Sequence, residues 1–116
     1  MKYIFLAYAD EKQWDTLSSS ERDALGDACQ ANDQALRERG YLLAVEGLHS
    51  SCTATVRVQN SKVFITDGPV AETNEQLIGI FTINARDLNE AIQLAATIPP
   101  ARVGSIEVRP VRELSA

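Results

Sequence analysis

The residues best suited to chemistry lie in segment 63–73, where carboxylates follow a run of β-forming residues. Asp67 precedes Gly68 and Pro69 in this segment. Because glycine reaches positive φ and proline fixes φ at about −65°, the turn should hold the Asp67 carboxylate rigidly at a strand end. A carboxylate sheltered in a cavity can act as a general base. Asp67 is therefore the first catalytic candidate, and Glu72 is a second acid placed to contact a substrate.

Both acids also have a purely structural interpretation. An Asp before Gly commonly folds its side chain onto the following main-chain amides, which forms an Asx turn. Glu72 and Glu75 suit the first turn of a short helix, where acids interact favourably with the helix dipole. The structural roles are the commoner ones in proteins, so the sequence leaves both interpretations open.

His49 is the single histidine of the chain, and histidine ordinarily titrates near neutral pH. It follows Gly47 at the end of an expected strand, where it can donate a proton; a solvated loop histidine is the alternative. His49 and Cys52 have the spacing of a ligand pair, but zinc needs three or four protein ligands and the sequence offers no second pair. We therefore expect neither a metal nor a cofactor.

Two arginines are candidates for binding an anionic substrate. Arg57 and Arg109 alternate outward on expected strands, and a guanidinium can clamp a carboxylate through two parallel hydrogen bonds. Pairing with an acid of the same chain, such as Glu107, is the simpler alternative. Cys29 is expected to be a small apolar side chain of a helix rather than a nucleophile. Phosphate loops, nucleophile elbows and dinucleotide fingerprints are absent from the sequence.

Composition excludes several classes of partner. The 116 residues include 11 Lys and Arg against 16 Asp and Glu, a formal net charge of −5. This charge repels nucleic acid and anionic membranes, and no apolar run approaches the roughly 20 residues that a membrane helix needs. The first ten residues are interpreted as a strand rather than a secretory signal. We expect one cytoplasmic domain, residues 1–116, with reduced thiols.

Hydrophobic periodicity predicts the elements that must position these residues. Strands are expected at 2–8, 41–46, 77–83 and 105–109, and a hairpin at 53–59 and 62–66. Ser18 and Glu21 form a capping box that predicts a helix over 19–39, and Asp87 caps a second helix that ends before Pro99. A short helical turn is expected within 10–16, and an irregular loop over 48–52.

The predicted order is a ferredoxin-like βαββαβ arrangement with an inserted β-hairpin, of class α+β. Two helices then cover one face of the sheet, and a second copy is the most economical cover for the other. We expect a homodimer whose sheets enclose a cavity for a small molecule. In the hairpin, Ala54, Val56 and Val58 are expected to face inward, which leaves Thr55 and Arg57 toward solvent or a partner.

Four ordered motifs together resemble a known family. They are the first strand 1–4, the corner 45–48, the Asp67-Gly68-Pro69 turn with the following 71–73, and the tail 106–111. Over nearly the whole chain they resemble the YCII-related proteins, in the branch named for its DGPF motif. The resemblance implies a dimeric α+β barrel. Rare members of the family resemble dehydrochlorinases of aromatic breakdown.

The chain departs from this branch at several positions. Val70 stands where the motif has Phe, and Asn74 stands where many relatives carry Lys. Some YCII-type relatives are described with a His and Asp pair whose His lies on the first helix. Here the first predicted helix has no His, and Cys29 lies near the comparable point, so that pair is not carried over.

These observations lead to a functional hypothesis with two alternatives. The first is a small cofactor-free enzyme for proton transfer or elimination on a small organic molecule, with Asp67 and His49 catalytic. Arg57, Glu72 and Arg109 would then bind the substrate. The alternatives are a ligand-binding or regulatory module without catalysis, and a purely structural interaction protein.

Overall fold

The computed structural model describes residues 1–49 and 51–114, so Ser50 of the expected loop 48–52 lies outside the described residues. Four strands form one sheet in the order β2-β5-β1-β6, and two form a separate hairpin. The strands are β1 Lys2–Asp10, β2 Leu42–Gly47, β3 Ala54–Gln59, β4 Lys62–Asp67, β5 Glu75–Asn84 and β6 Gly104–Pro110. The helices are α1 Glu11–Asp15, α2 Ser19–Glu38 and α3 Leu88–Ala96, followed by the short 3-10 helix η1 Pro99–Arg102.

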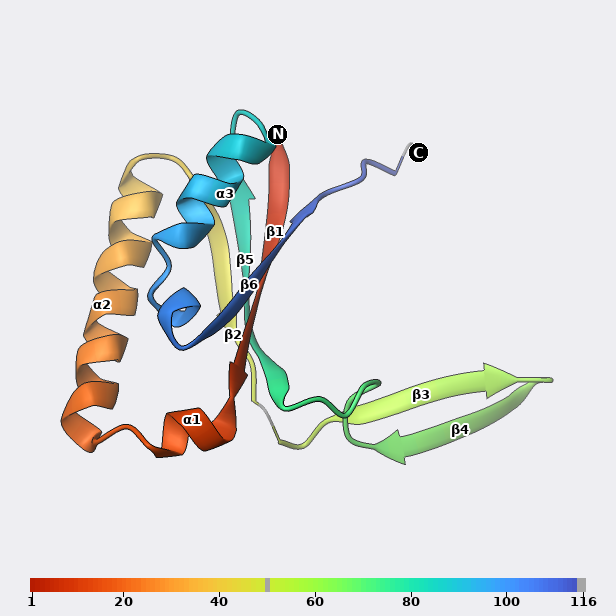
Figure 1. Cartoon of the computed structure of the whole chain (residues 1–116). Helices are drawn as coiled ribbons and strands as arrows, with labels where there is room; N and C mark the ends of the chain where they lie inside the picture. The colour runs from red at the N-terminus through yellow and green to blue at the C-terminus, as the bar shows by residue number, and fades with distance from the viewer. Residues whose placement is uncertain (50, 115–116) are drawn as a thin grey trace.

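The sheet confirms the expected ferredoxin-like α+β fold once the hairpin is set aside. β1 pairs antiparallel with both β5 and β6, and β2 pairs antiparallel with β5. Both long helices lie on the same side of the sheet (Figure 1). The hairpin projects from one end of the sheet on the side away from these helices (Figure 1). The fold is therefore one sheet with a single helical layer and a protruding arm.

The helices begin where the sequence predicts, because side chains satisfy their free amides. The Ser18 hydroxyl accepts a hydrogen bond from the Glu21 N–H at 3.1 Å, and the Glu21 carboxylate accepts one from the Ser18 N–H at 3.1 Å. This reciprocal capping box lowers the pKa of Glu21, chiefly through the bond from the Ser18 main chain. Asp87 caps α3 by accepting from the Glu90 N–H at 2.9 Å.

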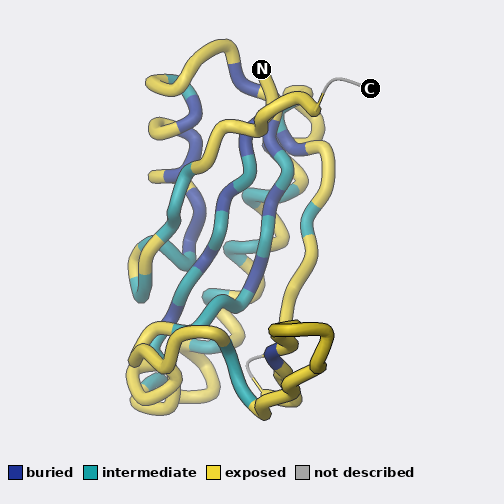
Figure 2. Tube along the Cα trace, turned by 90° about the vertical axis from the view of Figure 1, so that its right-hand side faces the viewer, coloured by how far each residue is buried: buried dark blue, intermediate teal, exposed yellow. Residues whose placement is uncertain are grey.

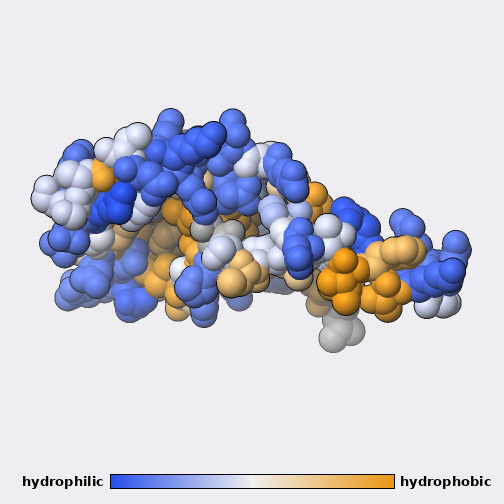
Figure 3. All heavy atoms as spheres, turned by 90° about the horizontal axis from the view of Figure 1, so that it is seen from below, coloured by the Kyte–Doolittle hydropathy of each residue, from blue (hydrophilic) through white to orange (hydrophobic). Residues whose placement is uncertain are grey.

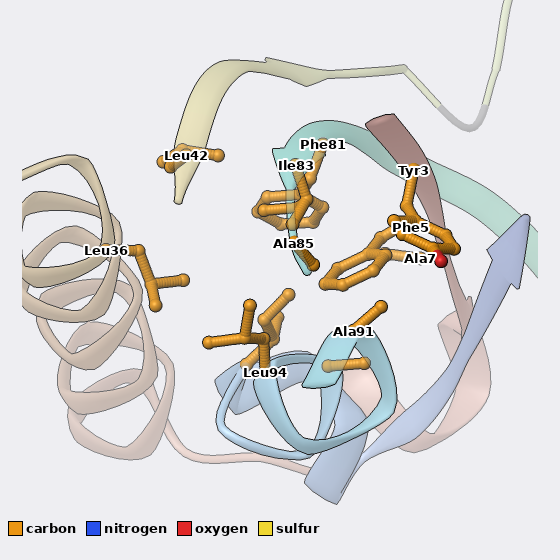
Figure 4. Packing of buried hydrophobic residues seen from close by; sticks show 12 residues of the cluster. Tyr3, Phe5, Ala7, Leu36, Leu42, Phe81, Ile83, Ala85, Ala91 and Leu94 are labelled. Atoms are coloured by element: carbon orange, nitrogen blue, oxygen red, sulfur yellow. The ribbon is translucent and has the colours of Figure 1, made fainter. Parts of the chain in front are cut away.

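The hydrophobic core lies between the sheet and α3. Phe5 and Ile83 are almost fully buried, and the strand register places Phe5 opposite Phe81. Figure 4 shows Leu94 of α3 among the side chains of this cluster, which Leu36 joins from α2. Leu36 is the one buried residue of α2. The apolar stripe that predicted α2 is therefore only partly covered along its length.

The sheet face opposite the helices is apolar at its centre. Strand alternation and register place Ile4, Leu6 and Tyr8 of β1 on this face, beside Leu77 and Ile80 of β5. All five residues are half-buried. Figure 2 looks onto this side of the sheet and shows that no further layer of the described chain covers it. We call it the open sheet face.

The hairpin, residues 54–67, is called the arm. The prediction that Ala54, Val56 and Val58 face inward is wrong: Val56 is 61% and Val58 65% exposed. Thr55, expected toward solvent or a partner, is 8% exposed. Alternation correctly separated the two faces of the strand, but it contains no information about which surface covers either face. In the protomer the arm stands away from the sheet, so its apolar face meets no core.

Two glycine-to-alanine substitutions should change stability in opposite directions. Gly104 pairs with Ala9, and a Cβ at Gly104 would overlap the main-chain carbonyl oxygen of Tyr8. Gly104→Ala should therefore destabilise the fold by about 1–3 kcal/mol. Gly26 lies in α2 with nothing near its Cβ position, so Gly26→Ala should stabilise by about 0.5–1 kcal/mol. Urea unfolding at one protein concentration measures both; a stable Gly104→Ala variant would contradict the described pairing of β6 with β1.

Candidate functional site

The Asp67 turn is held by the main chain and by Thr55. Gly68 adopts a φ of +101° and donates its N–H to the Thr53 carbonyl at 2.7 Å. The Thr55 hydroxyl donates to the Gly68 carbonyl at 2.8 Å. Within residues 1–49 and 51–114 the Asp67 carboxylate makes no hydrogen bond or ion pair, so the structure does not show the Asx turn that was one of the two interpretations of Asp67. Because Thr55 already fixes the turn, the exposed Asp67 carboxylate is left available to a ligand.

His49 lies in the loop after β2 and lines a pocket of about 420 Å³, here called the arm-base pocket. Tyr8 and Leu77 contribute to it from the open sheet face, and Thr55 contributes from the base of the arm. Glu75 adds a carboxylate, one oxygen of which accepts a hydrogen bond from the Ser105 hydroxyl at 3.2 Å. The pocket thus combines apolar walls with a histidine, a phenol and an acid.

Asp67 lines a neighbouring pocket of about 430 Å³ rather than the arm-base pocket. Thr53, Ala54 and Pro69 line both pockets and so form the boundary between them. The structure therefore brings His49 and Asp67 to the same end of the sheet but places them on different sides of that boundary. A ligand would have to extend across it to touch both side chains.

The structure adds two site residues that the sequence interpretation missed. Tyr8 and Glu75 line the arm-base pocket and also a third depression, of about 530 Å³, with Ser105 and Glu107 of β6. Alternation places Tyr8 on the same face of its strand as Ile4 and Leu6, but only the register with β5 sets it beside Leu77 at the pocket. No sequence signal identifies Glu75, because its position depends on β5 beginning earlier than its apolar residues suggest.

The remaining predicted binding residues lie apart from these depressions. Glu72 is exposed in the loop before β5 and does not line any of the three. The helical interpretation of Glu72 and Glu75 is wrong, since Glu75 begins β5. Arg57 lies on the arm opposite Phe64, and it too lines none of the three depressions. In a single protomer neither residue lines the arm-base pocket.

Arg109 is already paired within its own strand. Its Nε donates to the Glu107 carboxylate at 2.6 Å, which confirms the simpler of the two sequence interpretations. This hydrogen bond is the main reason that the pKa of Arg109 is raised. Both side chains are substantially exposed, so the pair contributes little to stability. A ligand carboxylate would have to compete with Glu107 for the guanidinium.

The structure also bears on metal binding, on thiol chemistry and on membrane insertion. In the part of the chain that the structure describes, no three His, Cys, Asp or Glu side chains gather closely enough to hold a metal ion. Burial and then the nearby Asp33 carboxylate raise the pKa of Cys29, which makes its thiol a weaker nucleophile at neutral pH. None of the described helices is long and apolar enough to cross a membrane.

Comparison with known proteins places the chain in a family. A model of the YCII-related domain matches residues 1–115. The chain belongs to the YCII-related family. It is also 34% identical over 114 residues to an uncharacterised protein of Rhizobium meliloti strain 1021, and this match covers 96% of the chain and 92% of that protein. The family resemblance drawn from the four motifs is thus confirmed, while neither match names a reaction or a ligand.

The Thr55 hydroxyl should be needed for the Asp67 turn of this YCII-related protein. Thr55→Val leaves the Gly68 carbonyl without its side-chain donor, which should cost about 1–3 kcal/mol locally. Thr66→Val is the matched control, because Thr66 pairs with Thr55 across the arm but is exposed. Amide hydrogen exchange at Gly68 measures the effect. We expect faster exchange in Thr55→Val alone; equal rates in both variants would remove Thr55 from the turn.

Proposed function

We propose that this YCII-related protein binds a small organic molecule in the arm-base pocket. The observation that supports the proposal is the composition of the pocket: Leu77 and Val70 supply apolar walls, and His49, Tyr8 and Glu75 supply polar groups. Small-molecule sites are commonly pockets of about 300–1,000 Å³ with mainly apolar walls and a few polar groups that orient the ligand. The pocket, at about 420 Å³, falls within this range.

The proposal extends to a homodimer in which two open sheet faces enclose the ligand. In one protomer Tyr8 and Leu77 of the open sheet face line the arm-base pocket. Ile4, Leu6 and Ile80 give that face an apolar centre, and an uncovered apolar sheet face is a common dimer contact. We further propose that the chain is a single domain of the DGPF-motif branch. Its two free cysteines suit a cytoplasmic location.

Proton transfer or elimination is the reaction that we propose for the same site. His49 lines the arm-base pocket and Asp67 lies across its boundary, so a ligand that extends past Pro69 can meet an acid and a base at different atoms. Arg57, Glu72 and Arg109 stay candidates for a charged group of the ligand. Binding or regulation without catalysis is the second candidate, and it is favoured by the separation of His49 from Asp67 into two pockets.

Binding is tested by thermal unfolding with a panel of small aromatic and carboxylated compounds, with benzoate as the first probe. We expect at least one compound to raise the Tm, because a ligand that binds only the native state stabilises it by mass action. Leu77→Asp, in the pocket wall, should abolish the rise. Asp23→Asn changes an exposed acid of α2, which lies on the opposite side of the sheet from the pocket, and should keep it. A panel without a single stabilising compound, or a rise that survives Leu77→Asp, would count against the proposal.

Catalysis is tested by following a stabilising compound by NMR during incubation with the protein. We expect its signals to be replaced by those of a product, and Asp67→Asn should lower the rate by about 100-fold or more, as loss of a general base does. His49→Gln should also slow the reaction, whereas Asp23→Asn on α2 serves as the control. A bound compound that is never consumed assigns the protein to binding, and an unchanged rate in Asp67→Asn removes Asp67 from the mechanism.

A further inference from the structure

One face of the arm is made of four exposed apolar side chains. The strand register places Val56 opposite Ile65 and Val58 opposite Val63, so the four form two adjacent cross-strand pairs. They are between 61% and 70% exposed. Figure 3 shows hydrophobic atoms gathered along one side of the projecting arm. Phe64, which is 50% exposed, lies on the opposite face with Arg57. We call these four residues the apolar arm face.

An arm of this kind needs a covering surface to be stable. A two-stranded hairpin without a covering layer is only marginally stable in water. Burial of each of the four apolar side chains against a covering surface would also be favourable. Within the described residues of the protomer, nothing packs against the apolar arm face. Along β3 the sequence nevertheless alternates strictly between small or apolar and polar residues, a pattern typical of a strand with one covered face.

The size of the uncovered surface matches a second copy of the chain. The protomer exposes 8288 Å², whereas a compact protein of 12.7 kDa exposes about 6,200 Å². Its radius of gyration is 16.3 Å, against about 13 Å for a compact chain of this length. A stable interface buries about 800 Å² on each partner. The excess of roughly 2,000 Å² is therefore ample for an extensive dimer contact.

Charge and position also favour a second copy of the chain as the surface that covers the apolar arm face. Arg57 and Lys62 give the arm two positive charges against the single carboxylate of Asp67, whereas the whole chain carries −5. The arm of one protomer is therefore attracted to the body of another. The arm also projects on the same side as the open sheet face, so both uncovered apolar surfaces can meet the same partner (Figure 1).

Asp67 lies on the same face of the arm as the four apolar residues. The register pairs Asp67 with Ala54, two residues along each strand from the Val56 and Ile65 pair, and alternate residues share a face. A surface that covers Val56 and Ile65 therefore also approaches the Asp67 carboxylate, which in the protomer is exposed to water. The candidate base would gain its sheltered environment from that surface.

We propose that each arm packs its apolar face against the second copy of a homodimer, and that the second copy thereby shelters Asp67. The Asp67 site is then complete only in the dimer, and each protomer stabilises the other's arm. This inference rests on the dimer of the proposed function and assigns the arm a role within it.

The test compares Val58→Asp with Gln59→Asp by sedimentation equilibrium. Both variants add one negative charge at neighbouring exposed positions of β3, but Val58 lies on the apolar arm face and Gln59 on the opposite one. We expect a wild-type dimer, a dissociation constant at least 100-fold higher for Val58→Asp, and little change for Gln59→Asp. If circular dichroism shows that Val58→Asp is unfolded, Val58→Ser replaces it because it adds no charge.

The outcomes separate this inference from the dimer itself. A wild-type monomer would overturn both the enclosed cavity and the arm contact. A wild-type dimer that Val58→Asp and Gln59→Asp weaken equally would overturn the arm contact and leave the dimer of sheets intact. Carbodiimide labelling of Asp67, quantified by mass spectrometry, tests the shelter: we expect slower labelling in the wild type than in Val58→Asp. Equal labelling would overturn the role of the second copy at Asp67.

Discussion

The structure depends on a central strand that is apolar on both faces. On one face of β1, Phe5 and its alternate neighbours pack into the core beneath α3; on the other, Leu6 and its neighbours stay half-buried. A sheet with two apolar faces is most stable between two layers. The described residues supply a single layer of helices. The missing layer is the physical reason for proposing that a second copy covers the open sheet face.

The same constraint explains why the candidate site is incomplete in one protomer. The arm-base pocket lies where β1 and β5 reach the end of the open sheet face, beside the base of the arm. Asp67 is held in place by Thr55 and Gly68 but is exposed to water. A rigid turn can orient a carboxylate, but only a covering surface can change its solvation. Orientation is thus provided by the chain, and shelter is left to an additional surface.

Much of the fold could be predicted from the sequence, because local patterns determine local structure. The capping residues Ser18 and Asp87 mark both long helices, and strand alternation located all six strands to within a few residues. The site was predicted less completely. His49 and Asp67 could be proposed from the sequence because their side chains suit acid–base chemistry and follow expected strands. Tyr8 and Glu75 join the candidate site only because the register of β1 with β5 brings them together.

By itself, the sequence determined which residues alternate, where helices begin, and that Gly68 could turn the chain after Asp67. These properties depend on side-chain chemistry within a few residues. Only the tertiary structure decided that the arm leaves the sheet, that Thr55 rather than Asp67 fixes the turn, and that His49 and Asp67 line separate pockets. Those outcomes depend on which distant surfaces meet, and a pattern that separates two faces of a strand does not specify the surface that will cover either one.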